Sequence, residues 1–144
     1  MTFQKPLFAS PQDVEKAFYA AVQRADIEAL MAVWAEDEEI VCVLPGGPRL
    51  AGYTNVREAW RRIFESNRRF SIAISQVMVV AQGMLVAVHN LHALVTIKGS
   101  EPGKAAPVLA TNIYIRGANG WRMLVHHSSP TPPDTSSESS RMLH

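Results

Sequence analysis

The sequence predicts an α+β fold in which three N-terminal helices pack on a strongly curved, mostly antiparallel mixed sheet. Up to about residue 66, apolar residues recur every three or four positions, as along one face of a helix, with a short strand between the second and third helices. After about residue 68, apolar residues alternate with polar ones or run continuously through four long segments. Turn residues separate these segments, which favours antiparallel neighbours.

One folded domain accounts for the length and composition. The chain has 144 residues, of which 47% are hydrophobic and 19% charged, values typical of a globular protein with its own core. We expect an N-terminal arm over residues 1–9, the folded domain over residues 10–130 and a disordered tail over residues 131–144. The tail is expected to be disordered because it has too few apolar residues to fold alone.

The composition also disfavours several classes of function. A net charge of +1 provides no concentrated basic surface for nucleic acid. Cys42 is the only cysteine, which excludes an intrachain disulfide and a cysteine-built zinc site. No apolar segment is long enough for a membrane span, and the first ten residues lack the apolar core of a signal peptide. We therefore expect a cytoplasmic protein with no nucleic-acid or membrane partner.

Three helices are predicted from caps and apolar stripes. The first begins at Ser10, whose hydroxyl can cap the helix, with Pro11 in the first turn. Asp26 caps a second, short helix, and a third begins near Thr54. The apolar stripes are Val14, Ala17, Phe18, Ala21 and Val22 in the first, Ile27, Leu30, Met31 and Trp34 in the second, and Val56, Ala59, Trp60, Ile63 and Phe64 in the third.

The strands follow from prolines, glycines and apolar patterns. The first strand covers residues 39–44 and ends at a Pro-Gly-Gly-Pro turn, because proline cannot donate to the sheet. A short extended piece follows at residues 50–52. Four long strands are expected at about residues 69–81, 84–98, 106–116 and 120–129.

Both faces of the strand at residues 84–98 are largely apolar, so both should be covered. Three helices can cover one side of a curved sheet of this size. A large apolar patch seldom stays exposed on the other side. We therefore expect a homodimer that forms through the outer face of the sheet.

The order of elements resembles the nuclear transport factor 2-like superfamily over roughly residues 10–130. It is most similar to the SnoaL-like and ketosteroid-isomerase-like branch, which includes relatives of the association domain of calcium/calmodulin-dependent kinase II. The resemblance rests on Ala25-Asp26, Trp34-Ala35-Glu36-Asp37, Pro45-Gly46-Gly47, Gly52 with Trp60, and Gly120-Trp121 followed by His126-His127-Ser128-Ser129. It implies a cone in which helices and sheet enclose an apolar pocket. Some members of the superfamily catalyse reactions of small molecules, and others only bind or assemble.

The ketosteroid isomerase mechanism needs a carboxylate base and strong hydrogen-bond donors. The resemblance places its tyrosine donor near Phe18, with Tyr19 on the adjacent flank, and its aspartate base near residues 42–44, where there is no carboxylate. Its second, acidic donor falls near Asn112, which can still donate a hydrogen bond. Because two of the three parts are missing, the sequence predicts that this particular mechanism is absent.

Strand alternation and the resemblance together suggest which polar residues line the pocket. His127 shares a face with Trp121 at the end of the last strand, and it is the candidate catalytic base because histidine titrates near neutral pH. His126 should face the opposite, dimer side. Asn112 and Tyr114 share a face, and Asn112 is a candidate ligand anchor because a buried amide must be hydrogen-bonded.

His89 and His92 lie on opposite faces of their strand, so only one of them can point inward. Matching the turns favours Asn90 and His92, although a register slip of one residue would reverse this choice. No HxH or HxxxH pair occurs, so neither a metal site nor a cofactor is expected. The expected ligand pocket comprises Trp34, Trp60, Asn90, His92, Asn112, Tyr114 and His127.

Two classes of function stay open. One is a non-catalytic module that binds a small, largely apolar molecule in the cone or that assembles with other copies. The other is a small-molecule acid/base enzyme, an isomerase, cyclase or hydrolase, that uses a pocket histidine. The missing isomerase base and donor favour the binding module.

Overall fold

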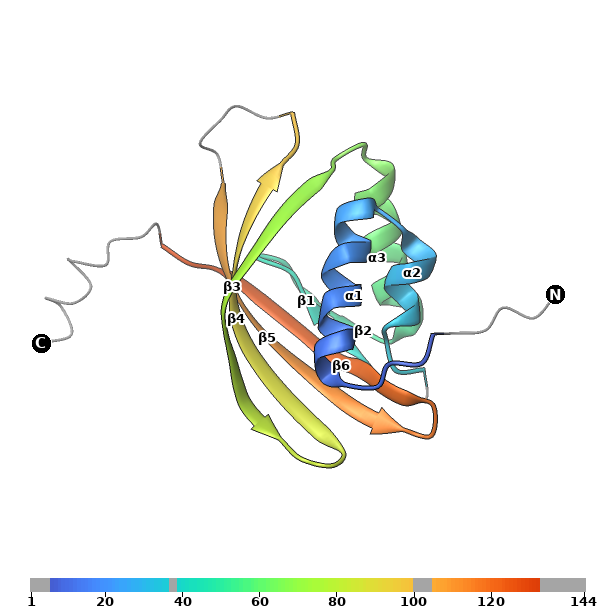
Figure 1. The fold of residues 1–144 in the computed structure, drawn as a ribbon. Coiled ribbons are helices and arrows are strands. Elements are labelled where there is room, and N and C mark those ends of the chain that lie inside the picture. The colour runs from blue at the N-terminus through green and yellow to red at the C-terminus, as the bar shows by residue number, and fades with distance from the viewer. Residues whose placement is uncertain (1–5, 37–38, 100–104, 133–144) are drawn as a thin grey trace, which may run out of the picture.

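The computed structural model describes residues 6–36, 39–99 and 105–132, which form three helices and six strands (Figure 1). The helices are α1 (Pro11–Arg24), α2 (Ile27–Ala32) and α3 (Tyr53–Glu65). The strands are β1 (Val41–Val43), β2 (Arg49–Ala51), β3 (Phe70–Gln82), β4 (Val86–Ile97), β5 (Ala106–Gly117) and β6 (Gly120–Pro130). Of the expected tail only residues 131 and 132 are described, and of the expected arm only residues 6–9.

The six strands form one mixed sheet in the order β2-β1-β6-β5-β4-β3. Every neighbouring pair is antiparallel except β1 and β6, which run parallel. Figure 1 shows the long strands β3 to β6 curving past the helices, which all lie on one side of the sheet. The predicted α+β fold is therefore confirmed. We call the helix-covered face of the sheet the inner face and the opposite one the outer face.

The ends of α1 and α2 follow from local hydrogen bonds. The Ser10 hydroxyl oxygen accepts from the backbone N–H of Asp13 at 3.1 Å. Asp26 caps α2 in the same way, accepting from the N–H of Ala29 at 3.1 Å. Between the two helices Ala25 has a φ of 55°, the left-handed conformation that commonly ends a helix. The tight link turns α2 back so that it packs against α1.

The core lies between the helices and the inner face of the sheet. Its largest fully buried side chains come from both layers: Phe18, Leu30, Met31, Trp34, Ile40, Leu91, Tyr114 and Met123. The helices each hide one apolar face in this layer, as expected of a two-layer domain. Among the described helices, none combines the length and the apolar character that a bilayer span requires.

Along β4 the inner-facing residues are Ala87, His89, Leu91 and Ala93, all of them buried. Asn90 and His92 alternate with them and face outward, contrary to the expectation from the sequence. The sequence alone leaves the register open, because both faces of this strand are largely apolar. The inner face offers His89 a buried polar partner from α1, described below, whereas His92 faces outward and stays partly exposed.

A bulge changes the alternation in the middle of β6. Ile113 of β5 pairs with Val125, but the next residue, Tyr114, pairs with Met123. Leu124 is therefore an extra residue with no partner on β5. An extra residue moves every side chain beyond it to the opposite face of the strand.

The bulge decides which histidine faces inward. Trp121 and Met123 are buried before it, and His126 and Ser128 are buried after it. His127 is exposed on the outer face. The expected orientations of His126 and His127 are therefore wrong, because they assumed unbroken alternation from Trp121 to the end of the strand.

Candidate functional site

A cavity of about 210 Å³ lies between the helices and the inner face of the sheet. Apolar side chains from α1, α3, the loop after β1 and the inner strand positions form its walls: Phe18, Val22, Leu44, Pro45, Trp60, Ile63, Phe70, Ile72, Ala93, Val95, Val108 and Ala110. Tyr19, His126 and Ser128 complete the lining. Among the described residues that line it there is no lysine, arginine, aspartate or glutamate, so the cavity favours an uncharged occupant.

Tyr19 and His126 are joined behind the cavity by Asn112. The amide nitrogen of Asn112 donates to the Tyr19 hydroxyl oxygen at 3.0 Å. The amide oxygen of Asn112 lies 2.6 Å from Nδ1 of His126. All three residues are buried, and the rings of Tyr19 and His126 lie 6.3 Å apart between centroids. We call this group the Asn112 chain.

The Asn112 chain fixes the tautomer of His126. Because the amide nitrogen donates to Tyr19, the atom facing Nδ1 is the amide oxygen, which can only accept. Nδ1 of His126 therefore carries the proton. In the neutral ring, Nε2 is then left with a lone pair and can accept a hydrogen bond or a proton.

Burial sets the charge states of this site. It lowers the pKa of His126 to about 3, with a smaller contribution from neighbouring His127, so the imidazole is neutral at neutral pH. Burial likewise raises the pKa of Tyr19. The hydrogen bond from Asn112 opposes this shift, and the nearby charge of Glu15 adds to it. The Tyr19 hydroxyl thus keeps its proton. The site presents a neutral ring and a protonated phenol to the cavity.

Cys42 lies next to the site, opposite His126 in the parallel pairing of β1 and β6. Burial raises the pKa of its thiol to about 12. A thiolate is therefore not available near neutral pH, and nucleophilic chemistry at this cysteine is disfavoured.

A second polar cluster lies deeper in the core, beside the Asn112 chain. Nδ1 of His89 lies 3.0 Å from Oε1 of Glu15, and the Tyr114 hydroxyl donates to the same oxygen at 3.1 Å. Only 8% of Glu15 and none of His89 or Tyr114 is exposed. His89 is the direct cross-strand neighbour of Asn112, so the two groups adjoin. We call this group the Glu15 cluster.

Of the residues expected in the pocket, four lie inside the fold. Trp60 lines the cavity, and Asn112 lies behind two of its polar lining residues. Trp34 and Tyr114 are fully buried in the core but do not line the cavity. The tyrosine instead belongs to the Glu15 cluster.

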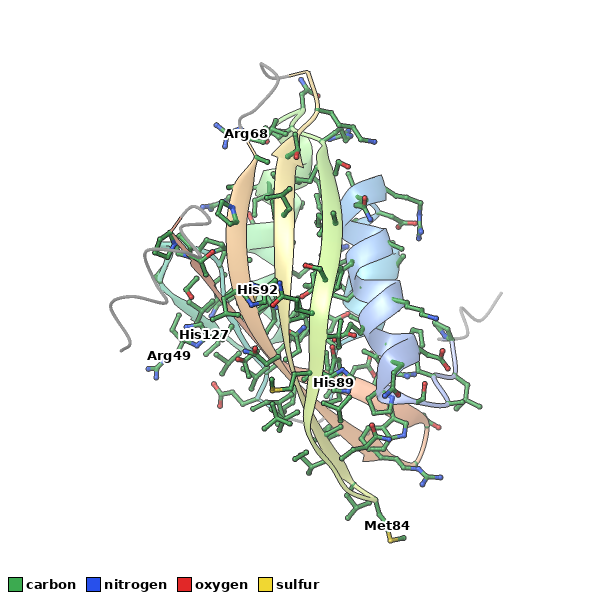
Figure 2. The ribbon with its side chains drawn as sticks, turned by 60° about the vertical axis from the view of Figure 1, so that its left-hand side comes forward. Arg49, Arg68, Met84, His89, His92 and His127 are labelled. Atoms are coloured by element: carbon green, nitrogen blue, oxygen red, sulfur yellow. The ribbon has the colours of Figure 1, made fainter. Side chains whose placement is uncertain are left out.

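The other three expected residues, Asn90, His92 and His127, lie on the outer face, away from the cavity (Figure 2 labels the two histidines). Asn90 donates there to the Thr111 hydroxyl at 3.1 Å. Unlike His126, His127 does not contribute to the cavity lining. The structure therefore transfers the role of candidate pocket histidine from His127 to His126.

Sequence reasoning missed Tyr19, His126 and Glu15. Tyr19 is expected only on the flank adjacent to Phe18, yet α1 buries both residues. A signal for Glu15 was present, since it lies three, four and seven residues before Phe18, Tyr19 and Val22, on the apolar stripe of the helix. A carboxylate on such a stripe indicates a buried partner.

A family model described as the SnoaL-like domain matches residues 12–133. Among solved structures, the chain is similar to a Thiobacillus denitrificans protein provisionally assigned as a calcium/calmodulin-dependent protein kinase type II association domain. The identity is 35% and the TM-score 0.80, over 88% of this chain and 99% of that one. It is also similar to a Streptomyces avermitilis protein provisionally assigned as a dehydratase of the nuclear transport factor 2-like family. There the identity is 26% and the TM-score 0.73, over 83% of this chain and 93% of that one.

Among curated proteins, the chain is similar to the F-box protein SKIP8 of Arabidopsis thaliana. The two are 26% identical over 116 residues, which is 81% of this chain. The match covers 47% of the plant protein, so the chain spans about half the length of the curated relative it matches.

Proposed function

The chain belongs to the SnoaL-like domain family, and we propose that it is a module that binds a small, uncharged, largely apolar molecule in the cavity. The observation that carries this proposal is an apolar cavity with Tyr19 and His126 at one side, held in place by Asn112. Ligand sites are typically apolar hollows with a few placed polar groups. Phe18, Trp60 and Phe70 add aromatic surface suited to a ring.

Binding without catalysis is the function that the charge states support best. His126 is a weak base, because its pKa is about 3. The described lining contains no carboxylate that could act in its place, and Cys42 keeps its proton. A general base works best when its pKa is close to the operating pH.

One observation favours an acid/base enzyme as a second candidate. His126 is held in a single tautomer with Nε2 available, beside a protonated tyrosine that can donate to an oxygen of a substrate. The Streptomyces avermitilis relative is provisionally assigned as a dehydratase. For this candidate the base is His126 rather than His127.

A ligand screen by thermal shift tests the binding proposal. Compounds that raise the melting temperature of the wild-type protein should stabilise His126→Gln less, because a polar contact in the cavity is changed. The matched control is His127→Gln, which alters the neighbouring, exposed ring on the outer face and should respond as wild type does. Equal stabilisation of all three proteins by every hit would contradict a ligand site beside His126.

We also propose that two copies associate through the outer face of the sheet. The outward side chains of β4 and β5 are Val86, Val88, Asn90, His92, Leu94, Thr96, Pro107, Leu109, Thr111, Ile113 and Ile115, and none is an acid, lysine or arginine. Two such faces can meet without like-charge repulsion. The relative from Thiobacillus denitrificans is provisionally assigned as an association domain, which supports assembly as a role.

The hairpin that joins β3 and β4 extends this uncharged surface. Every residue from 75 to 86 is exposed and none is charged. Figure 2 shows Met84 at its tip, at the opposite end of the molecule from Arg68. Met84 is 82% exposed, and apolar surface of this extent is typical of a protein interface.

Light scattering at micromolar concentration tests the association. The wild type should give twice the 15.9 kDa mass of the chain, and Leu94→Glu should give a monomer, because the new charge would be buried between two apolar faces. Leu7→Glu is the matched control, since Leu7 is 73% exposed on the N-terminal segment rather than on the outer face. A wild-type monomer would rule out this dimer.

A further inference from the structure

Two residues of the cavity lining have hydrogen-bonding capacity that no other described residue uses. The Tyr19 hydroxyl accepts from Asn112, and within the described residues no acceptor is found for its own proton. Nδ1 of His126 is bonded to Asn112, and Nε2 has no bonding partner in the described part of the chain. Both residues line the cavity. Tyr19 and His126 therefore hold one unused donor and one unused acceptor on two residues of the cavity lining.

This pairing of one donor with one acceptor does not depend on the orientation of the Asn112 amide. If the amide were rotated by 180°, Tyr19 would donate to the amide oxygen and Nδ1 of His126 would accept from the amide nitrogen. Tyr19 would then present a lone pair and Nε2 of His126 a proton. Because the amide has one donor end and one acceptor end, the two groups that it joins always leave at least one donor and one acceptor between them.

Resting on the proposed binding function, we infer that the ligand is a compact alcohol or phenol whose hydroxyl group bonds to Tyr19 and His126. A hydroxyl group both donates and accepts, so it can satisfy both residues. A ketone or ether only accepts, which leaves one of them unpaired in an apolar cavity. A carboxylate or ammonium group would bring a charge that the described lining does not neutralise.

The volume and walls limit the rest of the ligand. The cavity has a volume of about 210 Å³. It is smaller than the range of about 300–1,000 Å³ typical of drug-sized ligands. A single six-membered ring with one or two small substituents fits this space, between Phe18, Trp60 and Phe70.

Calorimetric titration with four matched probes tests the inference. The probes are 4-methylphenol, 4-methylcyclohexanol, 1,4-dimethylbenzene, in which a methyl group replaces the hydroxyl of the phenol, and 4-methylcyclohexanone, which only accepts. We expect the phenol and the alcohol to bind about tenfold or more tightly than their matched partners. In Tyr19→Phe and His126→Phe this preference should fall several-fold, whereas His127→Phe should keep it. Circular dichroism checks that each variant is folded. The comparison of the four probes on the wild-type protein does not depend on the variants.

The outcomes separate the ligand class from the binding function itself. If the hydrocarbon or the ketone binds as tightly as its hydroxyl partner, the hydroxyl inference is overturned while binding in the cavity stands. If both variants fold and keep the full preference, the hydroxyl does not bond to Tyr19 and His126, and the inference is likewise overturned. If none of the four probes binds up to its solubility, the inference and the binding function both fail.

Discussion

Replacing Glu15 by alanine is expected to lower the free energy of unfolding by about 3 kcal/mol or more. Glu15 accepts from His89 at 3.0 Å and from Tyr114 at 3.1 Å, and all three side chains are buried. Its removal leaves two buried polar groups without their partner, at a cost of about 1–3 kcal/mol each. Urea unfolding followed by circular dichroism measures the change.

Two further variants show whether the loss comes from unpaired groups. Glu28→Ala removes an exposed carboxylate that pairs with Arg57 at 2.8 Å, and it should cost less than about 1 kcal/mol. The triple change Glu15→Leu, His89→Leu and Tyr114→Phe should be more stable than Glu15→Ala alone, because no partner is then left unpaired. If the triple variant were instead less stable by the sum of its parts, the Glu15 cluster would owe its effect to packing and not to hydrogen bonding.

The fold was predictable because its signals are local and repeated. Ser10 and Asp26 carry their caps in the sequence, and the apolar stripes of α1 to α3 define which side of each helix is buried. Turn residues between long apolar segments indicated antiparallel neighbours, and the pairs β3–β4, β4–β5 and β5–β6 are antiparallel. Such signals need no knowledge of distant contacts.

The site was predictable only in part, because one residue of register decides it. Asn112 was placed inward correctly, since β5 keeps its alternation from Val108 to Tyr114. No glycine or proline in the sequence indicates the bulge at Leu124. Because of this bulge, His126 faces inward and His127 faces outward, the reverse of the expected orientations. For β4, the two apolar faces gave no local basis for choosing between His89 and His92, and only the contact with Glu15 in α1 distinguishes them.

Lowering the pH from 7 to 5 is expected to cost the wild-type protein about 2 kcal/mol more stability than it costs His126→Gln. Burial lowers the pKa of His126 from the ordinary value of 6.5 to about 3 in the folded protein. Between these two pH values the unfolded chain binds a proton at this ring that the folded protein does not bind. Acidification therefore favours unfolding over this window, with a slope of about 1.4 kcal/mol per pH unit in its steep part.

Urea unfolding at pH 7, 6 and 5 measures this difference, and only the change with pH matters, whatever the substitution itself costs at pH 7. His127→Gln is the matched control: it removes the adjacent, exposed ring and should keep the pH dependence of the wild type. Loss of the ring at position 126 should flatten the dependence of stability on pH above about pH 5. The folded and unfolded states then no longer differ in proton binding at this position. If wild type and His126→Gln lose stability in parallel, His126 titrates alike in both states. The assignment of His126 as a neutral, inward-facing imidazole would then be contradicted.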